Sequence, residues 1–260
     1  MVFGLFKSRR DDASPAEARA GVPACVPPGT TVYVIGDIHG CAGLLGRIHD
    51  QILIDAESRP TSRKVAVYLG DYIDRGPESR QVIDMLLDTP LEGFERHHLC
   101  GNHEAWMLQF MDDPAAGPGW FANGGLATLV SYGVGRGGGG SAEERLAQTR
   151  EALVERLPVH HRTFLENLSL THIEGDYLFV HAGLRPGVPL EAQSPDDMLW
   201  IREEFLFADA DFGKTIVHGH TIVREPEVAP ARIAIDTGAF ATGTLTCLVL
   251  EGDRHDFLTT

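Results

Sequence analysis

The chain has 260 residues, of which 43% are hydrophobic and 23% are charged, and its formal net charge is −15. This composition is typical of a globular protein with a sizeable core, and the length fits one large domain or two small ones. The negative charge argues against a nucleic-acid-binding surface, which normally carries a basic patch, and it means that an anionic substrate needs a local positive source.

The first 29 residues are predicted to form a disordered arm and linker ahead of a single domain, residues 30–260. Residues 1–12 hold a few apolar side chains before Lys7, Arg9 and Arg10, but not the apolar stretch that a signal peptide requires. No apolar run approaches the ~20 residues that cross a membrane. Because the four cysteines also lack disulfide-like spacing, we expect a cytoplasmic protein without stable membrane association.

Strands and helices alternate through the first half of the chain. Short apolar runs rich in β-branched residues predict strands at residues 31–35, 65–69 and 97–100. Apolar residues at helical spacing predict helices at residues 44–53, 82–87 and 104–111. This alternation is typical of βαβ units and indicates a mainly parallel sheet.

The second half of the chain is richer in predicted strands. Residues 168–172 and 177–180 flank a turn at Gly175 and predict a hairpin. Further strands are predicted at residues 215–217, 232–235 and 245–250. The Gly-rich segment 133–141 is expected to be a mobile loop, followed by an exposed helix over 142–157. We therefore predict one α/β domain with a second, mixed sheet layer.

Five of the predicted strands end in side chains that can bind metal ions. These side chains are Asp37, His39, Asp71, Asn102, His181 and His220. Ligands gather beyond the carboxyl ends of strands in α/β sheets, so we expect the six residues to lie together. Carboxylate, amide and imidazole ligands without cysteine suit Mn, Fe or Zn at a catalytic site. Six ligands suit two ions that share one carboxylate.

Each residue of this set, taken singly, also fits a purely structural role. A lone histidine at a strand end is more often a hydrogen-bonded structural residue, and Asp37 can cap the helix that follows it. Glu104 is accounted for as a first-turn acid at the positive end of a helix. We interpret His218 as a neighbour of the ligands and not as a ligand itself. The glycine-flanked pattern at five separate strand ends nevertheless favours a metal site.

The motifs GDIHG, GDYIDRG, GNHE, HAG and GHT occur in this order between about Val32 and Thr221. Together they resemble the phosphoprotein phosphatase family of dinuclear, calcineurin-like metallophosphoesterases. The segment Leu199–Phe205 looks most like that of the bacterial and phage serine/threonine protein phosphatases in this family. The resemblance implies an α/β fold in which two mixed β-sheets are sandwiched between helices, in an α/β/β/α arrangement.

The resemblance also implies a role for each motif residue. The implied metal ligands are Asp37 and His39 for the first ion, Asp71 for both ions, and Asn102, His181 and His220 for the second. His103 matches the general acid of the family, and Asp74 matches the residue that orients it. Arg75 and Arg202 match the two arginines that hold the phosphate group, a role that suits the planar guanidinium fork.

The resemblance implies hydrolysis of phosphomonoesters by in-line attack of a hydroxide that bridges two metal ions. The implied cofactors are two divalent ions, with Mn favoured over Fe and Zn. The expected substrate is a protein or peptide that carries phosphoserine or phosphothreonine. A dual-specificity enzyme would also accept phosphotyrosine. The alternative is a symmetrical diadenosine tetraphosphate hydrolase, and a third hypothesis is a binding module that has lost catalysis. The sequence leaves the oligomeric state open.

Overall fold

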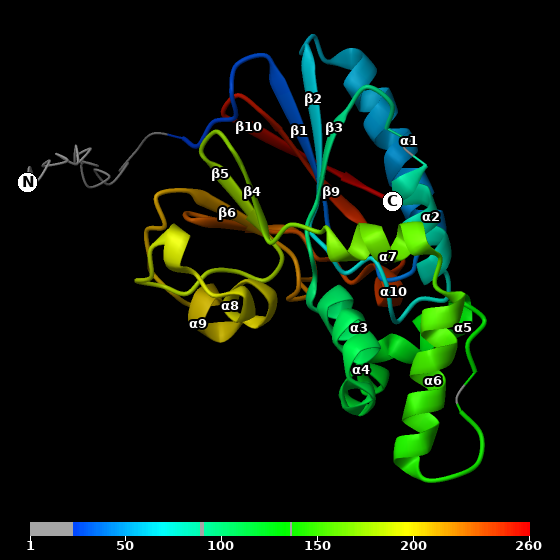
Figure 1. Ribbon diagram of the computed structural model, residues 1–260. Coiled ribbons are helices and arrows are strands. Elements are labelled where there is room, and N and C mark those ends of the chain that lie inside the picture. The colour runs from blue at the N-terminus through cyan, green and yellow to red at the C-terminus, as the bar shows by residue number, and fades with distance from the viewer. Residues whose placement is uncertain (1–22, 89–90, 136) are drawn as a thin grey trace, which may run out of the picture.

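The computed structural model describes residues 23–88, 91–135 and 137–260 of the chain. Its centre is a pair of five-stranded sheets that pack face to face, with helices on their outer faces (Figure 1). The strand orders are β10-β9-β1-β2-β3 and β4-β5-β6-β8-β7. Both sheets are mixed, so the predicted α/β/β/α arrangement is confirmed.

The first sheet contains three parallel and two antiparallel strands. They are β1 (Thr30–Ile35), β2 (Arg63–Tyr68), β3 (Glu95–His98), β9 (Thr246–Glu251) and β10 (Arg254–Thr259). The strands β1, β2 and β3 run parallel, whereas β9 and β10 are antiparallel to their neighbours. The sequence analysis missed β10 because this edge strand is largely exposed and its sequence, RHDFLT, lacks an apolar run.

The second sheet begins with the predicted hairpin. Its strands are β4 (Thr171–Glu174), β5 (Tyr177–Val180), β6 (Thr215–His218), β7 (Glu227–Ala229) and β8 (Arg232–Ala234). β4 pairs antiparallel with β5, which confirms the hairpin, and β5, β6 and β8 run parallel. The short edge strand β7 was not predicted, since three largely exposed residues give no periodic signal.

The core between the sheets fixes their relative position. Val34 and Val67 of the first sheet and Phe179 and Val217 of the second are fully buried in it. Each such side chain contributes about 1.5–3 kcal/mol by its burial. Val26 joins this core, and its N–H donates to the carbonyl of Gly252. The described end of the predicted linker, residues 23–29, thus packs against the sheets, while residues 1–22 lie outside the described residues.

The helices form three groups. α1 (Ala42–Ser58) and α2 (Ser79–Leu87) cover the outer face of the first sheet, and the short helices α8 (Pro195–Trp200) and α9 (Glu203–Leu206) cover that of the second (Figure 1). The others are α3 (Asn102–Asp112), α4 (Gly117–Trp120), α5 (Leu126–Ser131), α6 (Ala142–Arg156), α7 (Val159–Glu166) and α10 (Ala239–Thr242). Short turns of helix lie at Pro114–Ala116, Phe121–Gly125 and Leu190–Ala192.

Two further predictions concern the Gly-rich segment and membrane spans. Residues 133–135 and 137–141 connect α5 to α6 without regular structure, and the predicted mobility of this loop stays a prediction. The predicted helix over 142–157 is confirmed as α6. Among the described residues, no helix has the length and apolar character needed to cross a bilayer.

Candidate active site

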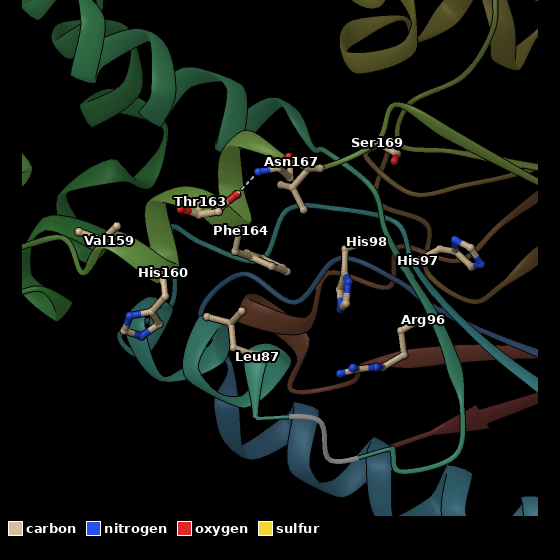
Figure 2. A pocket seen from close by; sticks show the side chains of 11 residues that line it. Leu87, Arg96, His97, His98, Val159, His160, Thr163, Phe164, Asn167 and Ser169 are labelled. Carbon is tan, nitrogen blue, oxygen red and sulfur yellow. Dashed lines mark hydrogen bonds between the residues drawn. The ribbon is translucent and has the colours of Figure 1, made fainter.

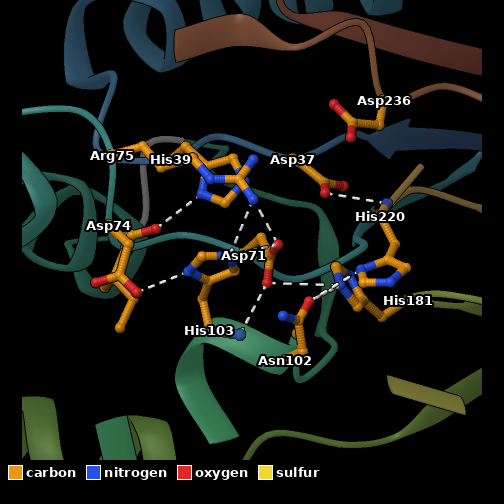
Figure 3. Close-up of polar contacts among 12 residues, drawn as sticks. Asp37, His39, Asp71, Asp74, Arg75, Asn102, His103, His181, His220 and Asp236 are labelled. Carbon is orange, nitrogen blue, oxygen red and sulfur yellow. Dashed lines mark hydrogen bonds and ion pairs between the residues drawn. The ribbon is translucent and has the colours of Figure 1, made fainter. Parts of the chain in front are cut away.

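The carboxyl ends of β1, β2, β3, β5 and β6 meet at one edge of the paired sheets. The side chains predicted as ligands lie there in one cluster (Figure 3). The cluster contains Asp37 and His39 after β1, Asp71 after β2, Asn102 at the start of α3, His181 after β5 and His220 after β6. All six are at least nine-tenths buried. Because polar side chains are costly to bury without partners, so dense a group needs a compensating ligand or network.

Asp71 occupies the middle of this cluster. Its Oδ2 lies 3.4 Å from His39 Nε2, and its Oδ1 lies 3.5 Å from His181 Nε2. Burial alone raises the pKa of this carboxyl, but His181, His103 and His39 together lower it below its ordinary value. One ionised carboxylate therefore has an imidazole on each side, which is the arrangement that a ligand shared by two cations requires.

The contacts of His181 indicate a cation beside it. His181 Nδ1 lies 2.9 Å from the carbonyl of Leu69, which fixes the proton on that nitrogen. Its Nε2 lone pair then faces Asn102 Oδ1 at 2.9 Å. Burial lowers the pKa of His181, which favours the neutral ring. His181 Nε2 and Asn102 Oδ1 are then both available as ligand atoms for one metal ion.

Buried atoms without partners complete the same pattern. Asp37 Oδ1, His39 Nε2 and His220 Nε2 are buried and make no hydrogen bond to any of the described residues. His39 Nδ1 lies 2.9 Å from the carbonyl of Ile73, so its Nε2 is the free ligand atom. Buried polar atoms are rarely left unpaired in native proteins. The donor set of carboxylate, amide and imidazole thus fits divalent metal ions.

The backbone at these positions is strained. Among the described residues other than glycine, positive φ angles occur at His39 (46°), Asp71 (50°), Asp74 (72°), Arg75 (65°) and His220 (61°). Such a conformation costs on the order of 1–3 kcal/mol per residue and persists only where the surroundings enforce it. Every one of these residues belongs to the site predicted from the sequence, which makes the strain a property of the site.

Glu104 holds the most strained loop in place. Its buried carboxylate accepts hydrogen bonds from the backbone N–H groups of Asp71, Tyr72 and Gly101 at 2.8–2.9 Å, and from Ile73 at 3.3 Å. In the bond from Gly101, Glu104 at the third position of α3 accepts the N–H of the N-cap residue, in line with the prediction of a first-turn acid. The other three bonds were not predicted, and they fix the backbone that carries Asp71.

His103 and Asp74 form a buried pair beside the cluster. His103 Nδ1 lies 2.7 Å from Asp74 Oδ2, which also accepts a hydrogen bond from Trp120 Nε1 at 2.7 Å. Thr128 Oγ1 donates to the other oxygen of Asp74 at 2.5 Å. Burial lowers the pKa of His103, but the carboxylates of Asp71 and Asp74 raise it above its ordinary value. His103 also lies close enough to His39 and Asp71 to contribute to a metal site by geometry alone.

The two predicted arginines border the cluster. Arg75 Nη2 donates to His103 Nε2 at 3.2 Å, and its guanidinium lies under the ring of Phe240, 4.7 Å from the ring centre. Arg202 Nη1 donates to the carbonyl of His220 at 3.2 Å and to Thr221 Oγ1 at 3.0 Å. The structure thus brings together every residue of the predicted site. These two guanidinium groups supply positive charge at the border of the cluster.

Three residues near the cluster differ in role from the ligands or from the role expected of them. Asp37 caps no helix, because α1 begins after Cys41 and Asp37 Oδ2 accepts the N–H of His220 at 3.0 Å. His218 lies outside the metal-binding groups, with its ring against Phe205. Asp236 was missed, although it follows a predicted strand as the other site residues do. It is buried near Asp37, and one of its oxygens has no partner (Figure 3).

A second hollow lies apart from this site, between β3 and α7 (Figure 2). Its volume is about 840 Å³, and its lining includes Arg96, His98, His160 and Phe164. It contains no residue of the predicted site. His98 is stacked on Tyr68 with ring centres 4.8 Å apart, so packing accounts for this histidine.

A family model supplies the first comparison with known proteins. The model for calcineurin-like phosphoesterases, Metallophos, matches residues 30–239 of this chain. The match begins at β1 and includes every residue of the predicted site.

The similar curated proteins share one printed name. A bis(5'-nucleosyl)-tetraphosphatase PrpE, named as asymmetrical, from Bacillus cereus is 29% identical over 231 residues. The match covers 83% of this chain and 88% of the relative. A protein of the same name from Bacillus anthracis is 28% identical over 231 residues, with the same coverage.

Solved structures of several phosphatases are similar in fold. A crystal structure of a candidate diadenosine tetraphosphatase has a TM-score of 0.59 and 21% identity, and the match covers 92% of this chain and 98% of that one. A cold-active protein-tyrosine phosphatase from a Shewanella species has a TM-score of 0.55 and 17% identity, with 90% and 83% covered. A serine/threonine phosphatase from Saccharomyces cerevisiae has a TM-score of 0.51 and 14% identity, with 91% and 83% covered. At these identities the likeness concerns the fold.

Proposed function

Since the chain belongs to the calcineurin-like phosphoesterase family and is a hydrolase of phosphoric ester bonds, we propose that its active site is the cluster around Asp71. The observation that carries the proposal is the position of the Asp71 carboxylate between His39 and His181, at 3.4 and 3.5 Å. Each of the two metal-binding groups that include Asp71 contains one of these histidines. This chain thus has two groups of side chains that could each hold one divalent ion.

The proposed ligands follow the sequence-based assignment. Asp37 and His39 bind the first ion, Asp71 binds both, and Asn102, His181 and His220 bind the second. Bound divalent ions supply positive charge for the phosphate and acidify a coordinated water. We propose Mn, with Fe and Zn as the alternatives, because oxygen and imidazole ligands occur together here without cysteine.

The remaining residues act on the substrate. His103 donates a proton to the leaving oxygen, and Asp74 holds the ring so that Nε2 faces the cluster. Arg75 and Arg202 bind the non-bridging phosphate oxygens in the forked geometry that guanidinium groups favour. In the absence of phosphate, Arg75 Nη2 is hydrogen-bonded to His103 Nε2, so the arginine must release this nitrogen when it binds the substrate.

We propose a dinucleoside polyphosphate as the substrate. Support comes from the relatives, which share 28–29% of their residues with this chain over most of its length and are named bis(5'-nucleosyl)-tetraphosphatases. A chain of several phosphates carries a large negative charge, and two arginines beside a metal site can offset it. The names of these relatives specify asymmetrical cleavage, whereas the alternative expected from the sequence is a symmetrical enzyme, so the cleavage position is part of the test.

The sequence-based preference, a phosphorylated serine or threonine in a protein, is the second candidate. The buried His103–Asp74 pair favours it, because an alkoxide is a poor leaving group and needs a proton in the transition state. The leaving nucleotide of a phosphate anhydride needs that proton less. A cytoplasmic location, where nucleotides and phosphoproteins both occur, remains part of the proposal.

One side-by-side experiment separates the candidates. Protein loaded with Mn is given diadenosine tetraphosphate, phosphoserine and phosphothreonine peptides and a phosphotyrosine peptide at matched concentrations. We expect the largest kcat/KM for diadenosine tetraphosphate, with AMP and ATP as products of asymmetrical cleavage or two ADP molecules as products of symmetrical cleavage. A larger kcat/KM for the peptides would replace the first candidate by the second.

A further inference from the structure

Two tryptophans line one side of the proposed active site. The ring of Trp106 lies at right angles to His103, with ring centres 5.7 Å apart, and contacts the ring of Trp200 at 4.5 Å. Trp200 in turn lies 6.2 Å from the ring of His220. About 36% of Trp200 is exposed to solvent, so part of an aromatic side chain next to the second metal group is accessible to a ligand.

Phe240 lies at the other metal group. Its ring centre is 5.4 Å from that of His39, and the Arg75 guanidinium lies 4.7 Å from it. About 38% of Phe240 is exposed. Since Trp200 adjoins His220 and Phe240 adjoins His39, each of the two metal-binding groups has its own partly exposed aromatic residue.

We propose that Trp200 and Phe240 are stacking surfaces for the two nucleobases of a dinucleoside polyphosphate, one on each side of the phosphate-binding centre. This inference rests on the proposed function and names the groups that select its substrate. Each ring also lies beside a proposed phosphate-binding arginine. Phe240 packs on the guanidinium of Arg75. Trp200 is two residues before Arg202, whose guanidinium donates hydrogen bonds to the His220 carbonyl and to Thr221 Oγ1.

The chemistry of the ligand follows from this placement. A dinucleoside polyphosphate has a highly charged centre and an aromatic base at each end. The site has two arginines for the charged centre and an aromatic side chain beside each of them for the bases. A phosphoseryl peptide brings one phosphate and no aromatic group. Stacking on an aromatic side chain is favourable for any base, so the site is expected to accept dinucleotides with different bases. Loss of one stacking surface changes affinity by about 5- to 150-fold.

The test compares substrates with and without bases. Trp200→Leu and Phe240→Leu are loaded with Mn, and kcat/KM is measured for diadenosine tetraphosphate and for methyl triphosphate, which has no base. We expect the ratio of the two kcat/KM values to fall at least fivefold in each variant, chiefly through KM for the dinucleotide. Trp200→Phe should recover most of the ratio. Phe207→Leu, which alters an 82% exposed aromatic residue outside the site, is the matched control.

A binding measurement without turnover completes the test. In calorimetric titration of the Mn-loaded protein, a diadenosine tetraphosphate analogue whose bridging oxygens are replaced by methylene groups, and which therefore resists hydrolysis, should bind more tightly than a methylene-bridged polyphosphate without bases, and Trp200→Leu should lose the difference. If the unaltered protein hydrolyses no dinucleotide, the proposed function is wrong. If it does hydrolyse the dinucleotide but the ratio of kcat/KM values is unchanged in both variants, the stacking surfaces are wrong and the proposed function stands.

Discussion

Replacement of Asp74 by asparagine tests the proposed general acid while leaving it in place. The amide oxygen of asparagine can accept the two N–H groups, from His103 and Trp120, that Asp74 Oδ2 accepts. The amide NH2 group then faces Thr128 Oγ1, a hydroxyl that can turn and accept. The variant therefore keeps the position of the His103 ring and loses only the negative charge beside it.

The expected loss of rate in Asp74→Asn follows from the loss of this negative charge. A hydrogen bond to a charged group contributes about 1.5–3 kcal/mol and a neutral one about 0.5–1.5 kcal/mol. Loss of the charge thus reduces the stabilisation of protonated His103 by about 1–2 kcal/mol, which corresponds to a decrease in rate of about 5- to 30-fold. Removal of the acid itself in His103→Asn should cost about 10²- to 10⁴-fold.

The assay measures kcat for both variants on phenyl phosphate and on 4-nitrophenyl phosphate, whose leaving group needs no proton. We expect the full losses on phenyl phosphate and much smaller losses on 4-nitrophenyl phosphate, at unchanged metal content. Equal losses on the two esters would refute the reasoning, because a general acid matters in proportion to the basicity of the leaving oxygen.

Three further predictions concern the frame of the site and the stability of the fold. Gly219→Ala places a Cβ against Asp37 Oδ1 and should weaken Mn binding in calorimetric titration, whereas Gly119→Ala, which meets only open space, should not. Glu104→Gln puts an NH2 group among four N–H donors and should lower the free energy of unfolding by about 1–3 kcal/mol in urea; an effect below about 0.5 kcal/mol would contradict the role of Glu104. Burial raises the pKa of Asp55, but Arg59 and Tyr33 lower it below its ordinary value. This carboxylate therefore stabilises the fold above its unfolded pKa of about 4. Asp55→Asn should lower the free energy of unfolding by about 1 kcal/mol at pH 7. The difference in this free energy between the variant and the unaltered protein should vanish as the pH falls through the pKa of Asp55 in the folded protein. A difference that persists in acid would contradict the role of the Asp55 charge.

The residues that the sequence could place are those with a local signal. Each predicted ligand follows an apolar run and has a glycine within two residues, and parallel strands bring such positions to one edge. Five β-type runs therefore sufficed to predict that Asp71 and His181, which are far apart in the chain, lie side by side. The burial and strain of the site follow from the same constraint, since a backbone that turns sharply at a strand end adopts positive φ.

Other features depend on contacts that no spacing encodes. Trp120 and Thr128 bind Asp74 from α4 and α5, and neither lies in a motif. Glu104 was placed correctly at the start of α3, but its bonds to the Asp71 loop depend on how α3 packs against that loop. Asp236 had the same strand-end signal as the ligands, since it follows an apolar strand and precedes Thr237 and Gly238, but it was overlooked.

The central claim is that Asp71 is shared by two metal ions. Electron paramagnetic resonance of the protein saturated with Mn²⁺, with the metal content measured on the same sample, tests this claim most directly. We predict two ions per chain whose spins are coupled, because one carboxylate joins them. A single bound ion, or two ions with independent signals, would contradict the claim.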